Sequence, residues 1–319
     1  MLPLISVIVP NYNHSAFLKD RLESVYKQSY PNIEVILLDD RSTDNSRELL
    51  LKYKNNSKTS HCVLNETNSG STFKQWNKGI SLAKGDYIWI AESDDYCDEN
   101  FLESLMVPFI KDPEVVLTYC QSYRVNSENK ITGNWITHTS HFEQHAFGKP
   151  FIMYGNEFIE NYLIHKNVIP NVSAVLFKKE ELLKIIPLNF QPYMKYNADW
   201  FYYIQLTCNA KLGFIAQSLN YFRYHESSVI AKANIESGWL KIYKMELQLR
   251  EAIMDSIKEC NPANLKNINE QSKKGNDQLY YIMALKFVNN GRKFRGIAML
   301  LNKPLLLKKL LSHIISKYK

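Results

Sequence analysis

Two adjacent carboxylates are the side chains of this sequence with the most evident chemical potential. Asp94 and Asp95 come directly after the apolar run 87–91 (YIWIA), which predicts a buried strand. Adjacent carboxylates in a loop at a strand end repel each other unless a cation neutralises them. Oxygen ligation favours Mg²⁺ or Mn²⁺ over zinc, and such an ion usually completes its shell with substrate phosphates. The alternative interpretation is a solvated acidic turn that caps a helix beginning near Asn100.

A third carboxylate stands at the end of another predicted strand. Asp40 follows the apolar run 33–38 (IEVILL) and the neighbouring Asp39. In open α/β sheets, ligands bind in the crevice outside the carboxyl ends of the strands. The residue type allows two roles: Asp40 can satisfy loop amides as a cap, or it can accept a hydrogen bond from a nucleobase or ribose.

The elements that must position these carboxylates alternate along the first 120 residues. Near-continuous apolar strands that alternate with amphipathic helices predict an α/β fold, with a parallel sheet covered on both faces. Right-handed crossovers then bring the carboxyl ends of these strands to one edge. Strands are predicted at 5–9, 33–38, 62–64 and 87–91, and helices at 17–26, 49–53 and 73–83.

The pattern changes from about residue 114. Further strands are predicted at 115–119, 172–177 and 221–224, with a helix over 199–210. From about residue 236 onward, the periodicity predicts helices only. A polar stretch at 261–274, with Pro262 inside it and Gly275 after it, indicates a break between helices.

Composition excludes several classes of protein. The 319 residues are 45% hydrophobic and 22% charged, which is a globular mixture and rules out disordered and fibrous chains. The net charge of +7 suits an anionic small molecule or an anionic lipid surface, and no nucleic-acid partner is expected. Five cysteines, none at C-x-x-C spacing, disfavour a disulfide framework or a zinc site. With no long apolar span and no signal peptide, we expect a cytoplasmic protein, or one peripheral on the inner face of a membrane.

Seven short segments occur in an order and at a spacing that resemble a known family. They are ISVIVPNYN (5–13), QSY (28–30), EVILLDDRSTD (34–44), NSG (68–70), NKGI (77–80), AKGDYI (83–88) and SDD (93–95). Residues 5–104 resemble the inverting glycosyltransferases of family 2, which have the GT-A fold. The resemblance implies transfer of a sugar from a nucleotide-sugar donor.

The resemblance implies which residues bind the nucleotide. Asp40 matches the acid that binds the base, with Pro10 and Tyr12 lining the same pocket. Ser71 falls near the position where some relatives place a basic residue on the nucleotide. Arg41 stands where the Asp-Gly-Ser-Thr-Asp segment of the family has Gly, and it can serve as a substitute contact to phosphate or base.

The resemblance also implies the metal ligands and the base. In the D-x-D-type motif, Asp94 would face the ribose and Asp95 would hold Mn²⁺ or Mg²⁺ on the diphosphate. His225, in an Arg-x-His segment, is expected to contact the metal or the diphosphate. Asp199 precedes an apolar helix at the position of the family's catalytic base. The alternative for Asp199 is a helix cap with a depressed pKa.

Two further features have open roles. The stretch 135–151 carries three histidines and aromatic residues, among them Trp135 and His138, and is expected to be an acceptor-side loop or core packing. The tail 300–319 mixes leucines and isoleucines with lysines as a basic amphipathic helix. It can lie on an anionic leaflet, or dock on the catalytic domain or on a second subunit.

We therefore expect a GT-A catalytic domain over 1–235, with a nucleotide-binding half (1–113) and an acceptor half (114–235), followed by a helical region over 236–319. The expected reaction is metal-dependent, inverting transfer from a UDP-sugar to a hydroxyl of a glycan or lipid-linked glycan in surface polysaccharide assembly. A binder or scaffold that kept the nucleotide pocket is the first alternative. A nucleotidyltransferase is the second, although the segment 11–14 (NYNH) lacks the glycines of a triphosphate-binding loop.

Overall fold

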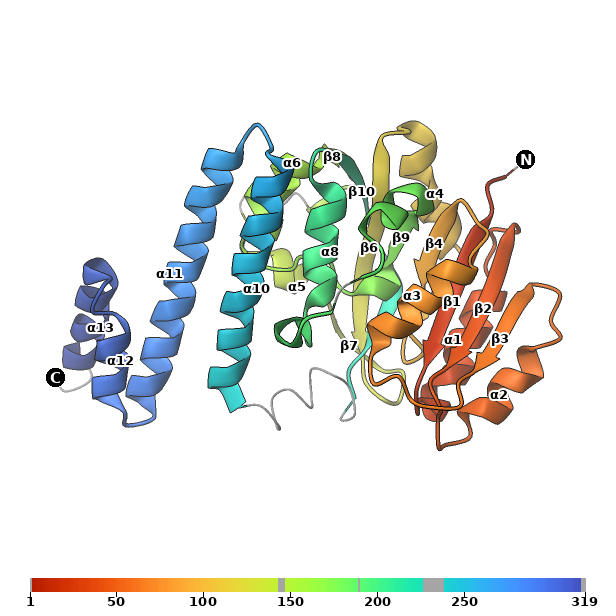
Figure 1. Cartoon of the computed structure of the whole chain (residues 1–319), viewed down its shortest axis with the longest axis horizontal. Helices are drawn as coiled ribbons and strands as arrows, with labels where there is room; N and C mark the ends of the chain where they lie inside the picture. Colours follow the sequence, from red (N-terminus) through yellow and green to blue (C-terminus); the bar gives the residue numbers. More distant parts are fainter. Residues whose placement is uncertain (1, 143–146, 189, 226–237, 317–319) are drawn as a thin grey trace.

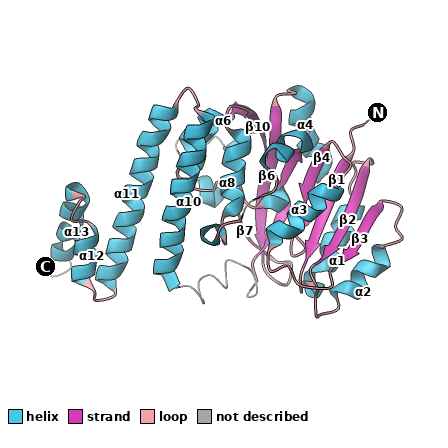
Figure 2. Cartoon of the chain, in the orientation of Figure 1, coloured by secondary structure: helices cyan, strands magenta, loops and turns pink. Residues whose placement is uncertain are grey.

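The computed structural model describes residues 2–142, 147–188, 190–225 and 238–316. Within these residues, ten strands form one sheet with helices on both faces, and further helices extend the molecule to one side (Figures 1 and 2). The strands are β1 (Ile5–Asn11), β2 (Ile33–Asp39), β3 (Thr59–Leu64), β4 (Tyr87–Ile90), β5 (Tyr96–Cys97), β6 (Val115–Val125), β7 (Ile131–Asn134), β8 (Phe151–Tyr154), β9 (Val175–Lys178) and β10 (Lys211–Arg223).

Helices connect and cover these strands. The α-helices are α1 (Ser15–Tyr26), α2 (Ser46–Tyr53), α3 (Thr72–Leu82), α4 (Phe101–Lys111), α5 (Ile136–Thr139), α6 (Gly155–Phe158), α7 (Lys179–Leu182), α8 (Ala198–Thr207), α10 (Gly238–Cys260), α11 (Leu265–Asn289), α12 (Lys293–Met299) and α13 (Pro304–Ser316). Short 3₁₀ or π turns are η2 (Ile159–Leu163), η3 (Val172–Ala174), η4 (Leu183–Ile185) and η5 (Pro192–Met194).

The first part of the sheet confirms the parallel βα pattern. Strands β3, β2, β1 and β4 lie in that order and pair in parallel. Every residue of β1 and β2 is buried, as expected for strands covered on both faces. Their carboxyl ends share one edge, which is the lower edge in Figure 1.

The second part of the chain continues the same sheet. β9 pairs antiparallel with both β4 and β6, and β10 runs parallel to β6. Two strands are longer than predicted. The prediction 115–119 covers only the start of β6, and 221–224 covers only the end of β10, and the two strands pair along most of their length. The expected halves 1–113 and 114–235 thus share one continuous sheet.

Two hydrophobic clusters fill the two faces of the sheet. One packs Leu22 of α1, Leu50 of α2 and Leu105 of α4 against the strands. The other contains side chains of α3 and α8 together with Leu249 and Ile253 of α10. The helix α10 is therefore part of the core that holds the α/β portion together.

The C-terminal helices differ from the sequence prediction in one respect. The break predicted at 261–274 is wrong for most of its length, because α11 begins at Leu265 and runs through Gly275. A Cβ on Gly275 would lie 3.1 Å from the Arg250 guanidinium, so close packing of α10 on α11 explains this glycine. A separate small cluster joins Ala284 and Val288 of α11 to Leu300 and to Leu310 of α13. No helix in the described residues is long and apolar enough to cross a membrane.

The loop after β2 holds a residue in an unfavourable backbone conformation. Arg41 has a φ of 63°, in the left-handed region that glycine adopts most easily. The Gly that the resemblance implies at this position would adopt this conformation without strain. We expect Arg41→Gly to leave stability unchanged or to raise it by up to about 1 kcal/mol, since relief of strain is offset by the greater freedom of unfolded glycine.

Urea denaturation of the two proteins measures this change. A loss of more than about 1 kcal/mol would show that the Arg41 side chain makes a stabilising contact that outweighs the strain.

Candidate functional site

A cavity of about 490 Å³ opens near the carboxyl ends of the strands. Acidic side chains, aromatic rings and two lysines line it. They come from the loop after β4, from α3, from the start of α8 and from α10. The lining residues used below are His14, Trp76, Glu92, Asp94, Asp95, Trp135, His138, Lys166, Asn167, Asn171, Asp199 and Arg223.

Asp94 and two histidines form a compact group beside this cavity. His225 Nε2 donates to Asp94 Oδ2 at 3.0 Å. One ligand atom from each of His14, Asp94 and His225 lies within 4.8 Å of the others. Burial tends to raise the pKa of Asp94, but the hydrogen bond from His225 and the charges of both histidines outweigh it, so the pKa is lowered.

This group has the donor chemistry of a divalent-cation site. Two imidazoles and a carboxylate suit Mn²⁺ better than Mg²⁺, which prefers oxygen ligands only. His14 Nδ1 is hydrogen-bonded to Ser93 Oγ at 2.9 Å, the kind of outer contact that fixes the ring of a metal-ligating histidine. The sequence analysis missed His14, although it directly follows the polar residues after β1 at the expected edge.

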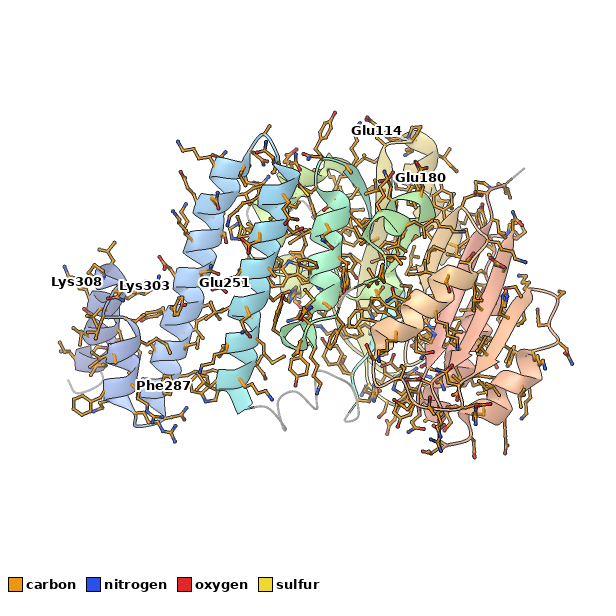
Figure 3. All side chains as sticks on the ribbon, viewed as in Figure 1. Glu114, Glu180, Glu251, Phe287, Lys303 and Lys308 are labelled. Carbon is orange, nitrogen blue, oxygen red and sulfur yellow. The ribbon has the colours of Figure 1, made fainter. Side chains whose placement is uncertain are left out.

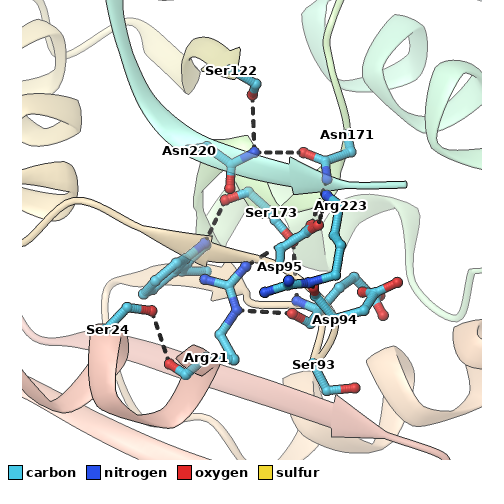
Figure 4. A network of polar contacts seen from close by, with 12 residues as sticks. Arg21, Ser24, Ser93, Asp94, Asp95, Ser122, Asn171, Ser173, Asn220 and Arg223 are labelled. Carbon is cyan, nitrogen blue, oxygen red and sulfur yellow. Dashed lines mark hydrogen bonds and ion pairs between the residues drawn. The ribbon is translucent and has the colours of Figure 1, made fainter. Parts of the chain in front are cut away.

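Asp95 occupies a different place from its neighbour (Figure 4). Its Oδ1 accepts from the backbone N–H of Arg223 at 2.9 Å, and its Oδ2 accepts from Asn171 Nδ2 at 2.6 Å. The Arg21 guanidinium lies 3.9 Å from Oδ2. Only 1% of Asp95 is exposed. The geometry therefore ties Asp95 to the interior of the molecule, although this residue also lines the cavity, and its expected metal role stays a prediction.

Arg223 is likewise directed inward. Its Nε donates to the Asp94 carbonyl at 2.6 Å, and Nη2 forms an ion pair with Asp20 at 3.2 Å. The guanidinium lies 4.6 Å from the centre of the Phe17 ring. In the Arg-x-His segment, Arg223 is thus buried and holds the acidic loop through its backbone, and His225 is a candidate metal ligand.

Glu92 is a third acid of the same loop that the sequence analysis missed. Trp76 Nε1 donates to its Oε1 at 2.7 Å, and burial and then the charge of Asp94 raise its pKa to about 8. The preceding residue of α3, Gln75, donates to Asp40 at 2.8 Å. Consecutive residues of one helix thus connect the acidic loop after β4 with the acid after β2.

Asp199 lies in the first turn of α8 and faces the cavity. Asn167 Nδ2 donates to its Oδ2 at 3.2 Å. Burial raises its pKa to about 6, although backbone and side-chain hydrogen bonds act in the opposite direction. The depressed pKa expected of a simple helix cap is therefore not what the surroundings produce.

Of the residues expected to bind the nucleotide, Asp94 lines the cavity, and the other four lie outside its lining. Pro10 is buried in β1, and Tyr12, just after β1, is 47% exposed. Asp40 is buried, and its carboxylate accepts hydrogen bonds from the segment 65–75, including the Ser69 hydroxyl at 2.8 Å. Ser71 is the N-cap residue of α3, and its hydroxyl is buried. The structure thus brings Pro10 and Asp40 to one edge, with Asp40 also holding a loop in place.

Comparison with known proteins now decides the family. The model of the family described as "Glycosyl transferase family 2" matches residues 6–168, which span the acidic loop, Asp40 and the first part of the cavity wall. The chain belongs to glycosyl transferase family 2.

Two curated members of this family show how far the similarity extends. Glycosyltransferase GlyG of Streptococcus pneumoniae is 42% identical over 130 residues, which are 40% of this chain and 43% of GlyG. The poly(ribitol-phosphate) beta-N-acetylglucosaminyltransferase TarS of Staphylococcus aureus is 38% identical over 102 residues, 31% of this chain and 17% of TarS. The matched parts are less than half of either relative.

Solved structures of family 2 members confirm the fold. The crystal structure of S. aureus TarS 1–349 in complex with UDP has a TM-score of 0.58 and 20% identity, covering 89% of this chain and 72% of that one. The UDP-GlcNAc complex of the same fragment has a TM-score of 0.58 and 17% identity, covering 92% and 88%. The predicted GT-A fold with a helical C-terminal region is confirmed.

Proposed function

We propose that this chain transfers a sugar, with inversion, from a UDP-sugar to a hydroxyl of a glycan or lipid-linked glycan in surface polysaccharide assembly. The observation that carries the proposal is that one cavity is lined both by Asp94, which has His14 and His225 beside it, and by Asp199. UDP is supported by the UDP and UDP-GlcNAc complexes of TarS, and a polymeric acceptor by the poly(ribitol-phosphate) in the name of TarS.

In this proposal, Asp94, His14 and His225 hold the divalent cation, in place of the pair Asp95 and His225 expected from the sequence. A bound cation would neutralise charge on the diphosphate of the donor. Asp95 keeps a positioning role, since its hydrogen bonds hold the backbone that carries Asp94.

Asp199 is the proposed base. With a pKa of about 6, it is mostly ionised at neutral pH and remains basic enough to take a proton from an attacking hydroxyl. As the acceptor oxygen forms its bond to the anomeric carbon, the bond from that carbon to the diphosphate oxygen breaks, and the proton passes to Asp199. The Asn167 amide orients the carboxylate during this step.

The nucleotide would lie at the neighbouring strand ends. Tyr12 offers an exposed ring for the base, beside Pro10. Asp40 Oδ2 accepts one hydrogen bond, from Ser69, and keeps capacity to accept another from the base. The Ser71 hydroxyl is close in sequence to this acceptor, at the start of α3.

The C-terminal helices support contact with an anionic membrane surface. Residues 278–319 contain nine Lys or Arg and no Asp or Glu, so the first 277 residues hold 30 basic against 32 acidic residues. One face of α13 docks on α11 through the buried Leu310. Large apolar side chains elsewhere on α12 and α13 stay exposed: Phe294 is 89% exposed, Leu305 83% and Ile315 60%.

The placement of this basic apolar surface suits a lipid-linked acceptor. Lys308 lies on α13, at the end of the molecule opposite β3 (Figure 3). The helix α11 ends, near Phe287, at the same lower edge of the view where β1 and β2 end (Figures 1 and 3). A leaflet along this edge would face both the basic helices and the crevice at the strand ends.

The metal assignment predicts different effects for two neighbouring acids. Asp94→Asn should weaken Mn²⁺ binding, measured by calorimetry, at least about ten-fold, because a ligand is lost. Asp95→Asn should lower the melting temperature while retaining the ion. Glu99→Gln, which changes an exposed acid between β5 and α4, is the matched control. Unchanged Mn²⁺ affinity in Asp94→Asn, or loss of the ion in a folded Asp95→Asn protein, would refute the assignment.

The base assignment predicts a pH profile. Below about pH 6, Asp199 is protonated and cannot accept a proton, so kcat/KM should rise with pH and level off above about 7. Asp199→Asn should lower transfer about 10²–10⁴-fold with unchanged affinity for UDP. If the Asp199→Asn protein retains transfer, and its kcat/KM still rises with pH as in the parent chain, Asp199 is not the base.

The membrane assignment predicts binding to vesicles. The full chain should co-sediment with vesicles that contain phosphatidylglycerol and not with pure phosphatidylcholine, and a Phe294→Ser/Leu305→Ser variant should lose most binding. Ile110→Ser, which removes a 72% exposed side chain from α4, is the control. Two results together would show that this surface is a subunit interface instead: the parent chain does not bind vesicles, and gel filtration shows an oligomer for the parent chain and a monomer for the variant.

A further inference from the structure

Lys166 lines the cavity and Arg124 lies near enough to act on its charge, and the proposed reaction uses neither positive group. We propose that Lys166, Arg124 and Trp135 form a subsite for an oxyanion, a phosphate ester or a carboxylate, carried by the acceptor. The inference rests on the proposed function, since it names the chemical class of the acceptor of that same site.

The three residues are held together by contacts around α5. Lys166 Nζ donates to the His138 carbonyl at 2.8 Å. The ring of His138 lies against that of Trp135, with 4.5 Å between their centres. The Arg124 guanidinium lies over the Trp135 ring at 5.1 Å. Lys166, Trp135 and His138 line the cavity, so this wall is available to a ligand.

The positive charge of this wall has no acidic counterpart in the described part of the chain. Neither Lys166 nor Arg124 forms an ion pair there, and burial and then the charge of Arg124 lower the pKa of Lys166. His138 Nε2 donates to the Asn167 carbonyl at 3.0 Å. Burial, followed by the charge of Lys166, lowers the pKa of His138 to about 4, so this ring stays neutral at physiological pH.

Two buried donor atoms near Lys166, one of them on the cavity residue Trp135, also lack an acceptor. Arg124 Nε and Trp135 Nε1 are shielded from solvent, and neither has a hydrogen-bond partner among the described residues. An indole N–H and a guanidinium can only donate, and a lysine ammonium can only donate. A buried donor without a partner costs free energy, so a ligand that brings acceptor oxygens would be favoured here. An oxyanion supplies such oxygens and the missing negative charge.

The position of the subsite assigns the anion to the acceptor. Lys166 is followed by Asn167, whose amide donates to the proposed base Asp199. The proposed cation site at Asp94 lies on the loop after β4, whereas Lys166 and Asn167 precede β9. An anion held by Lys166 would therefore lie on the side of Asp199 from which the attacking hydroxyl arrives. The acceptor would be a sugar or polyol that carries its charge close to that hydroxyl.

Binding of small anions in EDTA tests the subsite without any need for activity. The full chain is titrated with methyl phosphate, with acetate and with glycerol, and binding is followed by calorimetry. We expect methyl phosphate or acetate to bind and glycerol not to bind. The anion that binds more tightly shows whether the acceptor carries a phosphate ester or a carboxylate. Lys166→Met and Arg124→Gln should each weaken anion binding about ten-fold, the effect of losing one charge-assisted contact.

Controls separate this site from other positive surfaces and from the proposed function. Lys308→Gln, on α13, should bind the anion as the parent chain does, and melting temperatures show that each variant is folded. UDP with Mn²⁺ should bind equally to the parent chain and to both subsite variants. Equal anion binding by the parent chain and by folded Lys166→Met and Arg124→Gln would overturn the subsite. Loss of UDP binding in the parent chain would instead overturn the donor site.

Discussion

The burial of three carboxylates within four residues is the constraint on which the rest of this structure depends. Glu92, Asp94 and Asp95 follow β4 at the edge of the sheet, where the charges repel one another and have little access to water. Their positions are maintained because each carboxylate has its own polar partners. Trp76 donates to Glu92, and the imidazole of His225 donates to Asp94.

The partners of the acidic loop come from both parts of the sheet, which explains how distant segments are joined. Arg21 of α1 donates to the Glu92 carbonyl at 2.8 Å. Arg223 at the end of β10 donates to the Asp94 carbonyl. Asn171, before β9, donates to Asp95 and is joined to Asn220 of β10 at 3.1 Å. The loop is thus fixed from three directions, so that Asp94 can face the histidines while Asp95 faces the interior.

Much of the fold could be predicted from the sequence because the signals are local. Continuous apolar runs bounded by polar residues identify β1, β2 and β4, and the carboxylates at their ends identify the edge that carries the site. The length of β6 was underestimated because polar residues follow its apolar start, and that of β10 because polar residues precede its predicted end. Ser122 of β6 and Asn220 of β10 are nevertheless buried, because Asn220 Nδ2 donates to Ser122 Oγ at 2.9 Å. The start of α11 was missed because its first turns are polar and Ile268 alone is buried there.

The finer assignment inside the acidic loop could not be predicted, because it depends on side-chain direction. Two adjacent aspartates look equivalent in sequence, and only their long-range partners distinguish them. Arg21 and Glu92 appear as an ordinary helical cation and an ordinary loop acid until the tertiary contacts are known. The proposed role of Lys166 was equally hidden, since it arises from the lack of an ion-pair partner for this cation in the described structure.

The central claim is that two imidazoles and the carboxylate of Asp94 form one cation site at the nucleotide diphosphate. Pulsed electron paramagnetic resonance of the full chain with Mn²⁺ and UDP tests it most directly, because it detects the nuclei coupled to the ion. The account predicts nitrogen couplings from imidazole, reduced in His14→Gln and in His225→Gln, together with phosphorus coupling from UDP. Phosphorus coupling with no nitrogen coupling would contradict it.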